Sequence, residues 1–93
     1  MACQIRYTQN ALASLSEILD YSWDEYPSST ASFGDALFDH LDLLREFPYL
    51  GSLVPNRPGV RRLVHSPILI YYQVLDGAEA VEILEFRHSS RQG

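Results

Sequence analysis

The stretch GVRRLVHSPILIYYQVLDGAEAVEILEFRH, residues 59–88, decides the fold of this chain. It holds three runs rich in β-branched and aromatic residues, which are separated by Ser66 and Pro67 and then by Asp76 and Gly77. Runs of this kind between turn residues predict three antiparallel strands joined by tight connections. The middle run, residues 68–75, is nearly all apolar and aromatic, which predicts a central strand with both faces covered.

One more strand and two helices are predicted upstream of this stretch. Residues 3–8, CQIRYT, alternate apolar and polar side chains as a half-buried strand does. Thr8 then stands at the N-cap of a predicted helix over about residues 9–26, in which apolar residues recur every three or four positions. A second apolar stripe predicts a helix ending at Pro48, and the short connection makes the two helices an antiparallel hairpin. Residues 48–59 contain three Pro and two Gly and predict a loop.

The predicted fold is therefore α+β, with the order β-α-α-β-β-β. A four-stranded antiparallel sheet must cover its apolar face, and the helical hairpin is the available cover. With 93 residues, 46% of them hydrophobic, we expect residues 1–93 to form a single domain around one core.

Composition excludes several classes of protein. The single Cys3 cannot form an internal disulfide, and no cluster of Cys and His has the spacing of a metal site, so we expect no metal and no cofactor. No apolar run is long enough to span a membrane and no signal peptide is recognisable, which predicts a cytoplasmic protein without a membrane partner.

The charged residues are unevenly placed. The net charge is −5, yet residues 47–93 hold five Arg against four acidic residues, and all seven basic residues of the chain are Arg. Arg favours forked recognition of carboxylate or phosphate groups. The alternative is a charged strand edge that discourages edge pairing. Candidates for a target-binding surface are Arg61, Arg62, Tyr72, Arg87, His88 and Arg91.

Several of these candidates carry an open alternative. Arg61 and Arg62 must point to opposite faces of their strand, so one is functional and the other lies at the rim. Tyr71 and Tyr72 also alternate, and either could contact a partner or lie in the core. His88 could serve as a general acid or base, or be a solvated residue.

Aromatic residues on the outer side of the helical hairpin are candidates for a groove that holds a partner segment. They are Trp23, Tyr26 and Phe38, and simple packing is the alternative. His40 and His65 are weaker candidates for a catalytic residue than His88. Because Arg57 lies in the predicted loop, we expect its replacement to matter less than that of Arg61 or Arg91.

The chain resembles the RelE/ParE superfamily of bacterial type II toxins, and within it the ParE-like, plasmid-stabilisation branch. IRYTQNALASLSEILDYSWDEYP, residues 5–27, is similar to the family's first strand and helix. Within residues 45–91, FP, a Gly loop, GVR, IYY and a closing RH pair follow in the family's order. The resemblance implies a β-α-α-β-β-β fold, an antitoxin that wraps the toxin with its C-terminal segment, and toxicity towards DNA gyrase or translating ribosomes.

The match to the ribonuclease branch is incomplete. RelE-like nucleases carry basic residues on the second and third strands, but here Leu69 stands at the third-strand position. A net negative chain is also a poor partner for ribosomal RNA. We therefore expect a non-enzymatic inhibitor of DNA gyrase, without catalytic residues or sequence-specific nucleic acid binding, that a cognate antitoxin neutralises.

Two alternatives to a gyrase inhibitor remain. One is a metal-free, ribosome-dependent mRNA endoribonuclease that uses His88 with Arg61 or Arg62, Arg87 and Arg91. The other is a non-toxic co-repressor that only binds an antitoxin.

Overall fold

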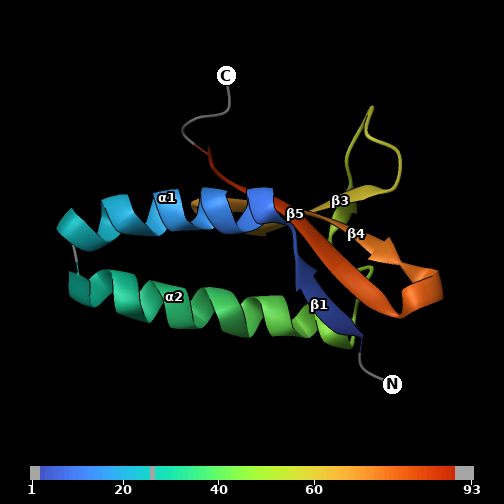
Figure 1. Cartoon of the computed structure of the whole chain (residues 1–93), viewed down its shortest axis with the longest axis horizontal. Coiled ribbons are helices and arrows are strands. Elements are labelled where there is room, and N and C mark those ends of the chain that lie inside the picture. Colours follow the sequence, from blue (N-terminus) through green and yellow to red (C-terminus); the bar gives the residue numbers. More distant parts are fainter. Residues whose placement is uncertain (1–2, 26, 90–93) are drawn as a thin grey trace.

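A computed structural model of the chain describes residues 3–25 and 27–89, without the side chains of residues 21–27. In chain order the elements are β1 (Gln4–Tyr7), α1 (Gln9–Glu25), α2 (Pro27–Asp42), the 3-10 turn Leu43–Arg45, β2 (Ser52–Leu53), β3 (Val60–His65), β4 (Ile68–Leu75), the 3-10 turn Asp76–Ala78 and β5 (Ala80–His88). Figure 1 shows α1 and α2 as an antiparallel hairpin beside the sheet, as predicted. No described helix is both long and apolar enough to cross a membrane.

The sheet differs from the predicted one in strand number and direction. It has five strands in the order β1-β5-β4-β3-β2. The extra strand, β2, lies within the predicted loop and pairs Ser52 with Arg62 and Leu53 with Arg61. β1 runs parallel to β5, so the sheet is mixed and the prediction of a wholly antiparallel sheet was wrong. Side-chain alternation has the same period in both directions, so it could not reveal the direction of β1.

The side chain of Thr8 links the start of α1 to β5. Its hydroxyl oxygen accepts a hydrogen bond from the Ala11 N–H at 3.0 Å, as an N-cap residue does. The same hydroxyl donates to the Leu84 carbonyl of β5 at 2.9 Å. The predicted cap is confirmed, and it also fixes α1 to the sheet.

We expect Thr8→Ala to lower the free energy of unfolding by about 1–2 kcal/mol, because both bonds of the hydroxyl are lost. Urea denaturation of the full chain measures this change. Thr8→Ser keeps the hydroxyl and serves as the matched control. A loss of equal size in the serine variant would contradict the hydrogen-bonding explanation.

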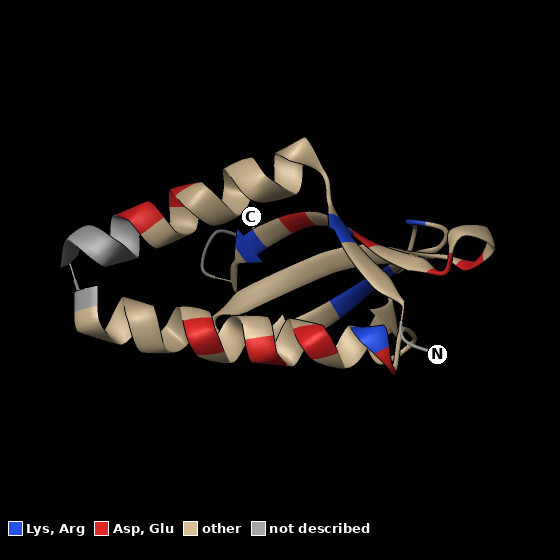
Figure 2. Cartoon of the chain, turned by 60° about the horizontal axis from the view of Figure 1, so that its bottom comes forward, with Lys and Arg blue, Asp and Glu red and all other residues tan. Residues whose placement is uncertain are grey.

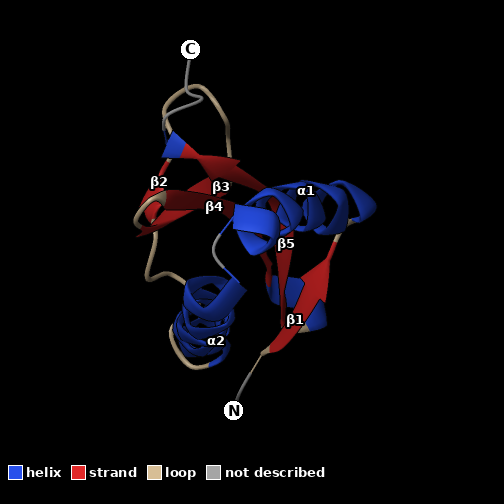
Figure 3. Ribbon diagram, turned by 90° about the vertical axis from the view of Figure 1, so that its left-hand side faces the viewer, coloured by secondary structure: helices blue, strands red, loops and turns tan. Residues whose placement is uncertain are grey.

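The main core lies between the sheet and the helical hairpin. β4 contributes Ile68, Ile70 and Tyr72, which pack with residues of both helices. Figure 3 shows α1 and α2 beside the strands. The buried residues that meet these β4 side chains are Ala11, Leu15, Leu37, Leu41 and Leu44 from the helical side and Leu63, Val81, Ile83 and Phe86 from β3 and β5.

We call the other side of the sheet the open face. There Val60, Leu69 and Tyr71 are buried in a smaller cluster, together with the half-buried Val54 and Leu84. Both faces of β4 are therefore covered, which confirms the prediction for the central strand.

A β-bulge changes which β5 residues share a face. Opposite Tyr71 and Tyr72 of β4, the pairing shifts from Glu85 to Ile83 and leaves Leu84 as the extra residue. Strict alternation would place Ile83 with Glu85, but Ile83 lies in the main core while Leu84 packs on the open face. Beyond the bulge, Glu85 and Arg87 accordingly lie on the open face, and Phe86 and His88 lie on the helical side.

The connections around β4 also depart from simple hairpin turns. Ser66 and Pro67 form the whole connection between β3 and β4, and their peptide bond is cis. The second connection is a 3-10 turn over Asp76–Ala78, in which Glu79, not Gly77, takes a left-handed backbone with φ of 49°. A turn was predicted at Asp76 and Gly77, but it is longer than a two-residue hairpin loop.

Candidate functional site

The open face carries a cluster of one aromatic ring, two guanidinium groups and one carboxylate. The Cζ atoms of Arg57 and Arg87 lie 5.2 and 5.4 Å from the centre of the Tyr71 ring, which is the range of cation–π contacts. Glu85 pairs with both cations, through Arg57 Nη1 at 3.3 Å and through Arg87 Nε at 3.2 Å. Tyr71 is only 4% exposed, so a partner would meet the guanidinium groups and not the ring.

The loop between β2 and β3 brings Arg57 onto the open face. The loop is closed by hydrogen bonds from Val54 N–H to the Val60 carbonyl and from Val60 N–H to the Arg57 carbonyl. Asn56 and Gly59 have φ of 65° and 77°, and these left-handed conformations suit Asn and Gly. Sequence reasoning set Arg57 aside as a loop residue. The Asn and Gly turn positions were the signal that this loop folds back on itself.

Arg62 adds a third guanidinium group to the open face. It is exposed and is the direct cross-strand partner of Tyr71. Residues in such a pair project from the same face of the sheet. The structure therefore brings Arg62 and Arg87 of the predicted candidates together, and adds Arg57, Tyr71 and Glu85 to them.

Electrostatics favours binding over proton transfer at this cluster. Three guanidinium groups face one carboxylate, and the Glu85 side chain is 18% exposed against 50% for Arg87. Arg keeps its proton in proteins, so these groups can bind carboxylate or phosphate but cannot act as a general base. Several acidic residues lie instead in a row along α2 (Figure 2).

Arg61 does not join this cluster. Its Nη1 donates hydrogen bonds to the Gly51 carbonyl at 2.7 Å and to the Tyr49 carbonyl at 3.3 Å. Its Cζ lies 5.0 Å from the centre of the Tyr49 ring, and the Tyr49 hydroxyl donates to Asp76. Arg61 thus fixes the segment before β2, and of the two neighbouring arginines Arg62 is the one on the open face.

Tyr72 was wrongly placed among the surface candidates. Its side chain is wholly buried, and its hydroxyl oxygen accepts the Gly51 N–H at 2.7 Å. Burial raises the pKa of the Tyr72 hydroxyl above the usual 10.0. The central-strand tyrosine on the open face is Tyr71.

His88 lies on the opposite side of β5 from Arg87. It lines a hollow of about 230 Å³ beside α1, together with Ser14, Ile18, Phe86 and Arg87, so Arg87 and His88 reach one hollow although they project from opposite faces of β5. Arg91 lies outside the described residues.

Only part of the predicted groove on the helical hairpin can be located. Phe38 is 43% exposed and lines a hollow of about 230 Å³ between the helices, with Leu19, Thr30 and Gly34. Trp23 and Tyr26 lie outside the residues whose side chains are described.

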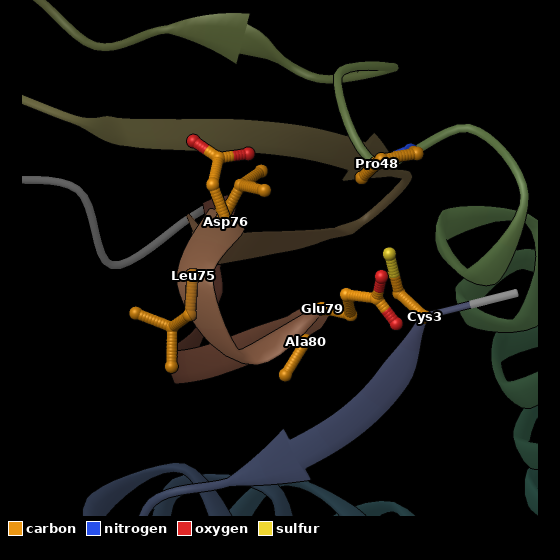
Figure 4. Close-up of a pocket in the computed structure, with 7 residues that line it drawn as sticks. Cys3, Pro48, Leu75, Asp76, Glu79 and Ala80 are labelled. Atoms are coloured by element: carbon orange, nitrogen blue, oxygen red, sulfur yellow. The ribbon is translucent and has the colours of Figure 1, made fainter.

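A larger hollow, of about 320 Å³, lies at the other end of β5. Figure 4 shows Cys3 at the start of β1, Pro48 before β2, and Asp76 and Glu79 of the β4–β5 connection around it. Within the described ranges, no three His, Cys, Asp or Glu side chains lie together in one cluster. This hollow lacks the cationic groups of the open face.

His40 of α2 and His65 of β3 form a pair that the sequence did not reveal. Their Nδ1 atoms are 2.8 Å apart, so the neutral pair shares one hydrogen bond. The edge of the Phe33 ring also contacts His65, with 5.3 Å between the ring centres. Burial, and secondarily the nearby His40, lowers the pKa of His65 below its ordinary 6.5.

We expect the chain to lose stability as the pH falls from about 6.5 towards the lowered pKa of His65. In this window the unfolded chain, whose His65 keeps the ordinary pKa, binds more protons than the folded chain. Chemical denaturation between pH 5 and 7.5 measures the effect. His65→Gln should show a weaker pH dependence, and an unchanged dependence would exclude His65 as its source.

The chain is similar to a chain of the chromosomal ParDE system from P. aeruginosa, with 21% identity and a TM-score of 0.76 over 94% of this chain and 96% of that one. It is also similar to a chain of the RelBE2 toxin–antitoxin complex from Mycobacterium tuberculosis, with 19% identity and a TM-score of 0.70 over 95% and 99%. A third similar structure is that of the isolated E. coli RelE toxin, with 19% identity and a TM-score of 0.67 over 98% of this chain and 88% of that one.

These similarities define the class: the chain has the α+β fold of the RelE and ParE toxins. The family described as the ParE toxin of the type II toxin–antitoxin system parDE matches residues 5–93. The chain belongs to this ParE toxin family. A comparison with curated proteins gave no match.

Proposed function

We propose that this ParE-family toxin inhibits DNA gyrase by binding it, without catalytic chemistry, through the arginine cluster of the open face. The observation that carries this proposal is the convergence of Arg57, Arg62 and Arg87 around Tyr71 on the side of the sheet away from the helices. Exposed Arg groups supported by an aromatic ring are frequent anchors of protein interfaces.

Two further observations favour a protein target over RNA. The overall charge of −5 opposes docking on a polyanion, so the positive groups act only locally. The third-strand position that is basic in RelE-like nucleases is occupied by Leu69, which is buried beside Tyr71.

We also propose that a cognate antitoxin neutralises this toxin in the cytoplasm. Two of the similar solved structures are complexes of a toxin with its antitoxin. On this chain the exposed Phe38 and the hollow beside Gly34 offer apolar surface between α1 and α2. An amphipathic antitoxin helix would place its apolar side chains in this hollow. Its polar side chains would then face the surrounding acidic and polar helix surface.

A supercoiling assay tests the proposed target. Purified toxin added to gyrase should reduce supercoiling of relaxed plasmid, and expression in cells should produce double-strand breaks. Arg62→Ala together with Arg87→Ala should remove both effects. Growth arrest with undamaged DNA and fully active gyrase would contradict this target.

Ribonuclease activity is the competing function, because the fold is shared with the RelE toxin. Mapping of mRNA ends after induction distinguishes the two. New ends within translated messages would support RNA cleavage, and unchanged transcripts alongside gyrase inhibition would support the first proposal.

A further inference from the structure

The His40–His65 pair joins two elements that are far apart in sequence. His40 lies near the end of α2 and His65 is the last residue of β3, where the chain turns into β4. The rings are 5.0 Å apart between centres and inclined by 53°, and both side chains are half-buried. Solvent therefore reaches the pair, although its two Nδ1 atoms point to each other at 2.8 Å.

We propose that His40 and His65 form a binding site for a divalent transition-metal ion that takes imidazole ligands, namely Cu²⁺, Ni²⁺ or Zn²⁺. Metal–nitrogen bonds to His are about 2.0–2.1 Å long, so two such ligands at right angles, as in square-planar or octahedral Cu²⁺ and Ni²⁺ sites, are about 2.8–3.0 Å apart, whereas tetrahedral Zn²⁺ needs about 3.3 Å. The Nδ1 atoms already stand at the right-angle separation. On binding, the proton shared by the two Nδ1 atoms moves to Nε2 of its own ring, and small rotations of both rings direct the Nδ1 lone pairs at the ion.

The chemistry of the pair selects the class of ion. Imidazole nitrogen binds Cu²⁺, Ni²⁺ and Zn²⁺, with Cu²⁺ tightest in the general affinity order, whereas Mg²⁺ and Ca²⁺ require oxygen ligands. Within the part of the chain that is described, no third His, Cys, Asp or Glu completes a cluster. Water would fill the remaining positions, which the partial exposure of both rings permits.

The surroundings of His65 restrict the orientation of its ring. The edge of the Phe33 ring packs against it, with 5.3 Å between the ring centres. A bound ion would link α2 directly to the β3–β4 hairpin. It would stabilise the packing of the helical hairpin on the sheet, independently of the open face.

Thermal unfolding of tag-free full chain with Cu²⁺, Ni²⁺, Zn²⁺ or Mg²⁺ tests this site. We expect the first three to raise the unfolding midpoint by about 4–8 °C at a concentration several times the dissociation constant, and Mg²⁺ to have no effect. His40→Gln and His65→Gln should each abolish the rise. His88→Gln, which changes the remaining histidine, should keep it.

Chemical modification of the unaltered chain gives a second measurement that does not depend on the folding of variants. Diethylpyrocarbonate should modify His88 equally with and without Ni²⁺, while Ni²⁺ should protect His40 and His65. Equal modification of all three residues would overturn the proposal. A midpoint rise that persists when both His40 and His65 are Gln would overturn it as well.

Discussion

Replacing both Arg62 and Arg87 by alanine is expected to lower toxicity by on the order of 100-fold or more. An Arg that is a hot spot of a protein interface contributes about 2 kcal/mol or more to binding, which corresponds to about 30-fold in affinity. Both side chains are exposed on the open face, so the substitutions should leave the fold intact. Arg57 would remain paired with Glu85 and could not replace the two lost groups.

Growth arrest on graded expression, measured as colony-forming units without antitoxin, gives the size of this effect. Arg45→Ala is the matched control, because Arg45 is also exposed but lies in the 3-10 turn after α2. Circular dichroism of the purified variants checks that they are folded. Equal loss of toxicity in the control and the double variant would mean that the open face is not the toxic surface.

Gly51→Ala is expected to lower the free energy of unfolding by about 2–4 kcal/mol. A Cβ atom at this position would lie 2.8 Å from the Arg62 carbonyl oxygen and from Cε1 and the hydroxyl of Tyr72. Tyr72 is wholly buried and cannot move away without disturbing the core. The bond from Gly51 N–H to the Tyr72 hydroxyl would also be lost or distorted.

Gly34→Ala is the matched control for this substitution. Gly34 lies within α2, and a Cβ atom there would meet nothing within 4 Å. Because Ala favours the helix, this change should stabilise the chain by about 0.5–1 kcal/mol. Urea denaturation of both variants tests the pair. Similar effects of the two substitutions would show that contact with Tyr72 does not decide the outcome.

The elements of the fold could be predicted because local patterns specify them. The apolar run over residues 68–75 is long enough to identify a central strand, and Thr8 before a periodic apolar stripe identifies a helix start. The direction of β1 and the pairing of the short β2 depend on contacts between distant segments. No local pattern carries that information.

The candidate site was only partly predictable for the same reason. Arg62 and Arg87 could be selected by residue type, but the bulge at Leu84 determines which face of the sheet each of Arg87 and His88 takes. The choice between Tyr71 and Tyr72 depends on Gly51, which packs against Tyr72. Arg57 reaches the cluster through the folding of its loop, which residue spacing does not show.

The parallel pairing of β1 with β5 has a consequence for synthesis. Thr8 is hydrogen bonded to Leu84, 76 residues further along, and β5 supplies Val81, Ile83 and Phe86 to the core. At translation rates of about 5–20 residues per second, β1 waits roughly 4–15 s for its partner strand. A nascent chain therefore cannot complete its sheet before β5 has been made. We expect the toxin to mature only after β5 has been synthesised.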